Sequence, residues 1–123
     1  GCAMAPPVQM ASVAAWNDEA HVLDNRNQYR EKFAACTPLI GEVLGTGMPD
    51  ASFYLWAKTP GADTDFARGL LEHYNVVVLP GSFLAREIRG VNPGANFVRI
   101  ALVASLAECL EATQRIRLFA QQL

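Results

Sequence analysis

The fold of this chain is decided by the stretch FVRIALV, residues 97–103. Every residue in it except Arg99 is apolar, which predicts a buried β-strand. Because side chains alternate between the two faces of a strand, Val98 and Ile100 would face the core and Arg99 the opposite face. A guanidinium there is either solvated or paired with a carboxylate, which suits its planar fork. The pattern alone leaves both interpretations open.

Two further strands are predicted upstream, at residues 52–56 and 76–79, with a helix between them. If this strand–helix–strand crossover is right-handed, the strand at 97–103 can lie between the other two and antiparallel to both. The predicted fold class is therefore α+β: a small, mostly antiparallel three-stranded sheet covered by helices on one face, with a long N-terminal helix.

The helices around this sheet carry start signals. Asp63 or Thr64 can cap the helix between the first two strands. Ser105 and Glu108 form a capping-box pattern for a final helix from residue 106 to about 120. The helix that follows Asp63 is predicted to bury four residues: Phe66, Leu70, Leu71 and Tyr74.

Two more helices are predicted before the sheet. Pro6-Pro7 starts an alanine-rich helix at residues 8–16, which is apolar on most sides, as in a core helix or one packed against a partner. A longer helix from about residue 22 to 44 contains Pro38, which predicts a kink near residues 34–37. One face of this longer helix carries an apolar stripe: Tyr29, Phe33, Cys36, Ile40, Val43 and Leu44.

Composition argues against several classes of function. The net charge is −2 and the charged residues are scattered, so the basic stripe that nucleic-acid binding requires is missing. No apolar run approaches the roughly 18 residues that span a membrane. Cysteines and histidines are too far apart in sequence for a zinc site or a disulfide framework, so buried, reduced thiols in a cytoplasmic protein are expected. These residues are Cys2, Cys36, Cys109, His21 and His73.

Few residues are candidates for binding or catalysis. Residues 80–96 form a long loop rich in Gly, Pro and Asn, and loops of this length are often functional. The loop carries three candidates: Arg86, Arg89 and Asn92. The alternative is a surface loop with solvated arginines. The only lysines, Lys32 and Lys58, are predicted to be solvated at the surface.

Two stretches carry a family resemblance: VVVLPGSF at 76–83 and VRIAL at 98–102. They resemble the closing signature of the class I/II aminotransferases, which are fold-type I pyridoxal-phosphate enzymes. In that family one strand ends in Pro-Gly-Ser-x-Phe and the next carries Arg-Ile-x-Leu. The chain as a whole most resembles the succinyldiaminopimelate aminotransferases of the bacterial lysine pathway. The segments concerned are GCAMAPPVQ (1–9), AWNDEAHV (15–22), LARE (84–87), GVNPG (90–94) and RIALV (99–103).

The resemblance implies a role for Arg99. In the family, the matching arginine holds the α-carboxylate of the amino-acid substrate by a bidentate salt bridge. Arg86, Arg89 and Asn92 would then contribute to substrate binding, with the two arginines as candidates for the distal succinyl carboxylate.

The resemblance also implies that much of the enzyme lies outside this chain. Residues 1–25 would be a remnant of the large domain and its junction helix, and residues 26–123 the C-terminal small domain. The lysine of the family's Ser-x-x-Lys segment has no match here, so we expect no catalytic residue in this chain and no pyridoxal phosphate bound by it alone. The start Gly1-Cys2-Ala3, without a methionine, is expected of a piece of a longer protein.

The whole protein implied by the resemblance is a cytoplasmic, homodimeric aminotransferase. It would bind pyridoxal phosphate in the large domain and move an amino group between glutamate and N-succinyl-2-amino-6-ketopimelate. Aspartate or an aromatic amino acid is the alternative substrate within the family. Outside the family, the alternative is a free-standing α+β module that binds amino acids without chemistry. An upstream coding stretch with a Ser-x-x-Lys segment would rule out the module.

Overall fold

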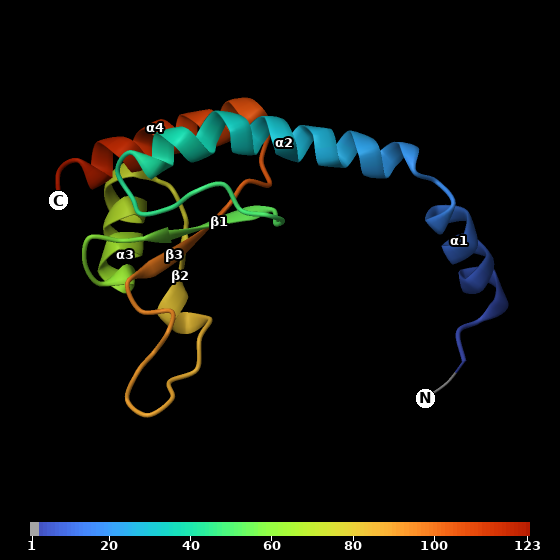
Figure 1. Cartoon of the computed structure of the whole chain (residues 1–123), viewed down its shortest axis with the longest axis horizontal. Coiled ribbons are helices and arrows are strands. Elements are labelled where there is room, and N and C mark those ends of the chain that lie inside the picture. Colours follow the sequence, from blue (N-terminus) through green and yellow to red (C-terminus); the bar gives the residue numbers. More distant parts are fainter. Residues whose placement is uncertain (1–2) are drawn as a thin grey trace.

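The computed structural model describes residues 3–123. Helices cover one face of a small sheet, and one helix stands apart from it (Figure 1). In chain order the elements are α1 (Pro6–Trp16), α2 (Ala20–Gly41), β1 (Tyr54–Lys58), α3 (Asp63–Tyr74), β2 (Leu79–Pro80), the 3-10 helix η1 (Gly81–Phe83), β3 (Phe97–Ala101) and α4 (Leu106–Ala120).

The three strands form one sheet in the order β1-β3-β2. β3 is antiparallel to both neighbours, as predicted, and Arg99 lies opposite Trp56 on one side and Leu79 on the other. Val98 and Ile100 are buried in the core, so Arg99 points to the other face of the sheet. The predicted α+β class with a small antiparallel sheet is confirmed.

The helices that contact the sheet share one core with it. α2 and α4 pack along each other, and α3 packs against α4 and the sheet (Figure 1). The largest fully buried side chains come from strands and helices alike and include Ile40, Leu55, Leu70, Val98 and Ile116. No α-helix in the described part of the chain covers the opposite face of the sheet, where Arg99 lies, although Gly81 of the short 3-10 helix η1 approaches Trp56 on that face.

α2 carries the predicted apolar stripe into this core. Phe33, Cys36 and Ile40 of this helix and Leu44 just after it are buried, and Tyr29 and Val43 pack against them. The helix runs without a break from Ala20 to Gly41 and contains Pro38. A kink at this proline stays a prediction.

α1 makes no buried contact with the rest of the chain. It begins at Pro6-Pro7, as predicted, but none of its residues is buried and Trp16 is 84% exposed. Figure 1 places it beyond the N-terminal end of α2, away from the sheet. The interpretation of this helix as part of the chain's own core is therefore wrong.

The strand predicted at residues 76–79 is wrong in its extent, because only Leu79 and Pro80 pair with β3. Asn75 ends α3 in the left-handed conformation, with φ 52°, and the residues after it approach the sheet without a ladder partner. Pro80 has no N–H to donate, which keeps β2 short. β1 lies at residues 54–58 rather than 52–56, two positions later than predicted.

The two predicted helix starts have different outcomes. The capping box of Ser105 and Glu108 is present at the start of α4. Neither Asp63 nor Thr64 caps α3, whose N-cap residue is Ala62 and has no side-chain cap. The carboxylate of Asp63 instead bonds to a distant loop.

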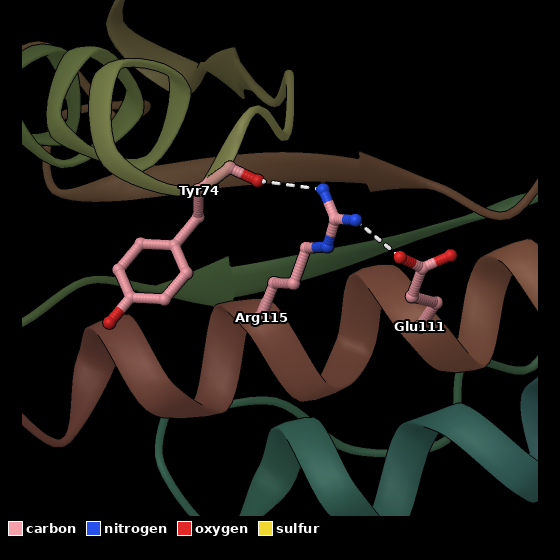
Figure 2. A network of polar contacts seen from close by, with 3 residues as sticks. All are labelled: Tyr74, Glu111 and Arg115. Atoms are coloured by element: carbon pink, nitrogen blue, oxygen red, sulfur yellow. Dashed lines mark hydrogen bonds and ion pairs between the residues drawn. The ribbon is translucent and has the colours of Figure 1, made fainter.

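The C-terminal end of α3 is fastened to α4 (Figure 2). Arg115 donates a hydrogen bond to the backbone carbonyl of Tyr74 at 3.0 Å and also pairs with Glu111. The first bond satisfies a carbonyl that the helix end leaves free.

Four residues were predicted to be buried on α3. The prediction is wrong for Leu71, which is 47% exposed.

Two further findings concern the described residues as a whole. No helix among residues 3–123 is long and apolar enough to cross a membrane, and this range contains no group of His, Cys, Asp or Glu suited to a metal ion. Cys36 and Cys109 are buried free thiols, as predicted, and burial raises the pKa of Cys109. Cys2 lies outside the described residues.

Candidate functional site

Arg99 stands in the middle of the open face of the sheet. It lies at the centre of β3, between Trp56 of β1 and Leu79 of β2. The neighbouring Val98 and Ile100 bury their side chains in the core. Strand pairing on both sides and core packing beneath therefore fix the backbone from which the guanidinium extends.

The guanidinium of Arg99 lacks a partner in the described chain. Its central carbon lies 5.5 Å from the ring centroid of Tyr54, within cation–π range. Its Nε is buried and has no hydrogen-bond partner among residues 3–123, and none of the ion pairs in that range involves Arg99. Buried donors are almost always paired, because leaving one unpaired is costly. The site therefore suits an anion from outside the described residues.

Two aromatic rings flank this position on the same face. Trp56 and Phe97 stack with centroids 5.7 Å apart and planes 12° from parallel. The ring of Trp56 also lies against Gly81, where a Cβ atom would come within 2.7 Å of it. Glycine at residue 81 therefore allows the backbone after β2 to approach the ring of Trp56 beside Arg99.

A single carboxylate holds both ends of the loop between β2 and β3. Asp63 is 4% exposed, and its oxygens accept the backbone N–H of Ser82 at 2.8 Å and of Asn96 at 3.2 Å. Burial raises the pKa of Asp63, but these hydrogen bonds lower it by more, so the pKa lies below its ordinary value. The carboxylate is therefore ionised at neutral pH.

The loop is also closed by its own residues. Asn92 donates to the Ser82 carbonyl at 3.0 Å and accepts from the N–H of Gly94 at 2.9 Å. Gly94 approaches the backbone of Gly81 so closely that a Cβ on it would lie 2.1 Å from the Gly81 oxygen. The stretch predicted as a long loop is thus fixed where it begins and ends.

The three loop candidates fall into two groups. Arg86 and Arg89 are exposed and make no side-chain hydrogen bond or ion pair within the described residues. Arg89 also has a positive φ of 54°. Asn92 is half-buried and braces the loop. No hydrogen bond or ion pair joins any of them to Arg99 in the described chain, so their contribution to substrate binding stays a prediction.

The prediction that both lysines are solvated is wrong for Lys32. Lys32 is 8% exposed, and its ammonium lies 4.9 Å from the ring centroid of Tyr29, which also packs on the core. The apolar stripe on this helix does not predict the burial of Lys32. The four-carbon stem of a lysine can nevertheless pack like an apolar side chain. Lys58, at the end of β1, is exposed as predicted.

Sequence reasoning missed three residues around the site. Tyr54 and Trp56 could have been found, because they alternate along β1 with the buried Leu55 and Ala57 and so share a face with Arg99. Asp63 gave no such signal, because its two partners lie 19 and 33 residues away in sequence.

A cleft of about 670 Å³ lies apart from Arg99, between the N-terminal half of α2 and residues 48–53. Its lining combines Arg26 and Arg30 with aromatic and other side chains. Arg99 does not line this cleft and is half-buried on the sheet.

Comparison with known proteins places the chain in a family. The family described as aminotransferase class I and II matches residues 2–116. A solved aminotransferase structure from Neisseria meningitidis is 52% identical with a TM-score of 0.89, covering 94% of this chain and 30% of that one.

Two further proteins carry more specific names. A Thermus thermophilus structure described as a probable N-succinyldiaminopimelate aminotransferase is 36% identical with a TM-score of 0.68, covering 84% of this chain and 27% of that one. The LL-diaminopimelate aminotransferase of Nitratidesulfovibrio vulgaris (strain Miyazaki F) is 31% identical over 114 residues, which are 89% of this chain and 28% of that protein. The chain thus spans less than a third of these relatives. It belongs to the class I and II aminotransferase family.

Proposed function

We propose that this chain is the C-terminal part of a fold-type I aminotransferase and that Arg99 binds the α-carboxylate of the amino-acid substrate. The observation that carries this proposal is the buried Nε of Arg99, which has no hydrogen-bond partner among residues 3–123. The α-amino-acid and 2-oxo-acid substrates of an aminotransferase carry an α-carboxylate. That group supplies the anion that the site lacks.

The position of Tyr54 supports a particular approach of the carboxylate. The Arg99 guanidinium lies over the Tyr54 ring, and all five of its N–H donors lie in its own plane. A carboxylate that meets the guanidinium edge can accept from Nε and one Nη at once. This pairs the orphaned donor and forms two charge-assisted hydrogen bonds that fix the orientation of the substrate.

The family implies pyridoxal phosphate in the intact enzyme, which supplies the electron sink for amino transfer when it is bound through a lysine. The two lysines of this chain do not fit that attachment. Lys32 is buried against Tyr29 on a helix of the core side of the sheet, whereas Arg99 lies on the other face. Lys58 is exposed to solvent. We therefore place cofactor attachment outside this chain and propose that the chain is inactive alone.

The rest of the enzyme would also cover surfaces that this chain leaves open. α1 is apolar and has no buried residue, which supports the division into residues 1–25, belonging with the large domain, and residues 26–123, forming the small domain. The intact protein is proposed to be a cytoplasmic homodimer. Closure of the small domain over bound substrate would exclude water from the Arg99 pair and strengthen it.

The proposed reaction is amino transfer between N-succinyl-LL-diaminopimelate and 2-oxoglutarate. Support comes from the segment resemblance and from the similarity to the Thermus thermophilus protein that carries this substrate in its description. The distal succinyl carboxylate needs a cationic partner, and the exposed Arg86 and Arg89 are the candidates in this chain. The alternatives are aspartate, an aromatic amino acid or unsuccinylated LL-diaminopimelate.

The test is a substrate panel with the full-length enzyme. N-succinyl-LL-diaminopimelate should give the highest kcat/KM, above LL-diaminopimelate, aspartate and tyrosine, with 2-oxoglutarate as acceptor. An analogue with an α-carboxamide should lose at least about 100-fold in kcat/KM, because it removes the charge that Arg99 binds. A preference for aspartate or tyrosine would refute the proposed substrate. An α-carboxamide as good as the acid would refute the role of Arg99.

A further inference from the structure

Asp63 lies outside the candidate site, yet it controls the geometry of the chain beside it. It is the first residue of α3 and nearly fully buried, but its carboxylate does not cap that helix. One oxygen accepts the N–H of Ser82 and the other accepts the N–H of Asn96. Ser82 follows β2 closely, and Asn96 directly precedes β3. One charged group therefore fastens both ends of the loop between these strands.

The attachment matters because the ladder that holds β2 is short. It has only two residues, Leu79 and Pro80, and Pro80 cannot donate a ladder hydrogen bond. Leu79 is nevertheless the register partner of Arg99 on that side of β3. Two features therefore hold the strand that borders Arg99: the burial of Val78 and Pro80, and the bond from Ser82 to Asp63 directly after the strand.

The same attachment also affects the position of the Trp56 ring. Gly81 lies between Pro80 and Ser82, and the Trp56 ring packs against it. Trp56 is the register partner of Arg99 on the other side. A shift of Ser82 away from Asp63 would therefore move Gly81 and release Trp56, and so would alter both neighbours of the guanidinium.

We propose that Asp63 is a positioning residue for substrate-carboxylate binding: by fastening Ser82 and Asn96 it fixes Leu79 and Trp56 on either side of Arg99. This inference rests on the proposed role of Arg99. It assigns to Asp63 no contact with substrate or cofactor. Its loss should therefore weaken carboxylate binding while the chemical step changes little.

The test compares Asp63→Asn and Asp63→Glu with Asp65→Asn in the full-length enzyme. Asp65 is a matched control, because it lies in the same helical turn but is exposed and pairs only with Arg68. Asp63→Asn turns one charge-assisted bond into a neutral one and leaves the other backbone N–H facing an NH2 donor, so KM for the amino-acid substrate should rise roughly tenfold. The value of kcat should stay within about twofold. Asp63→Glu keeps the charge and should recover part of the KM, and Asp65→Asn should leave it unchanged.

Two additional measurements distinguish a failure of the positioning role of Asp63 from a failure of the proposed role of Arg99. Amide exchange at Ser82 and Asn96 should quicken in Asp63→Asn, which reports the release of the loop even if overall stability also falls. Arg99→Lys is measured in parallel. If Arg99→Lys raises KM and Asp63→Asn does not, the positioning role is overturned and the role of Arg99 stands. If neither variant raises KM, the carboxylate site itself is wrong and the positioning role falls with it.

Discussion

Replacement of Arg99 with lysine tests the central physical claim, because it keeps the positive charge and removes the planar pair of donors. The ammonium cannot present two parallel N–H groups to one carboxylate. The loss includes the bond from Nε, worth about 1.5–3 kcal/mol for a charged partner, and the contact of the guanidinium with Tyr54, worth about 0.5–1 kcal/mol. These two contributions sum to about 2–4 kcal/mol, and truncation of a buried charge pair costs up to about 5 kcal/mol, so transition-state binding should weaken by about 2–5 kcal/mol. This corresponds to a fall in kcat/KM of roughly 30-fold to several thousandfold.

The assay is steady-state kinetics of the full-length wild type and Arg99→Lys, with most of the change expected in KM for amino-acid substrates. Cofactor absorbance serves as a control and should be normal, because the cofactor is proposed to attach outside this chain. Arg68→Lys is the matched control variant, since Arg68 is an exposed arginine paired with Asp65 and should tolerate the change. Unchanged kcat/KM in Arg99→Lys with normal absorbance would show that Arg99 is only a solvated strand residue.

Three further predictions concern the chain itself. The isolated chain should self-associate through α1, where Trp16 is 84% exposed, and Trp16→Ser should reduce the association; a clean monomer at high concentration in light scattering, without binding of a hydrophobic dye, would contradict this. Because the pKa of Asp63 is lowered by folding, its stabilisation is complete above the unfolded pKa of about 3.9 and is lost as pH falls through the lower folded value. The difference in urea stability between wild type and Asp63→Asn should thus shrink below about pH 4, and a difference that grows on acidification would reverse the assigned sign. Gly94→Ala should destabilise the chain by about 3 kcal/mol or more, because its Cβ would meet the Gly81 backbone, whereas Gly47→Ala, with nothing within 4 Å, should be nearly neutral in thermal unfolding.

The central strand was predicted well because its signal is local. Alternation in residues 97–103 placed Val98 and Ile100 in the core and Arg99 on the other face, and the structure confirms that placement. The stripe on α2 and the capping box at Ser105 were likewise readable within a few residues. These features depend on the period of a strand or helix, which a short window contains.

The failures share a different cause, which is that tertiary contacts decided them. Asp63 resembles a helix cap in a local window, but the N–H groups of Ser82 and Asn96 compete for its carboxylate and win. Val76–Leu79 has strand composition, yet the αL turn at Asn75 and the proline at residue 80 leave little of it able to pair. Lys32 is buried although a solvated lysine is predicted, because a helical period does not reveal where a long stem will pack.

The closed base of the loop after β2 has a consequence for how enzymes with this fold can diversify. Its two ends are locked by Gly81 against Gly94 and by the bonds to Asp63, while the tip carries the exposed Arg86 and Arg89. On the proposed roles of Arg99 and of the loop arginines, substitutions at the tip would exchange one distal specificity for another and leave the binding of the α-carboxylate unchanged. The tip of the loop would then vary while its base stays fixed, and new substrates would be acquired by substitutions that cost the scaffold little stability.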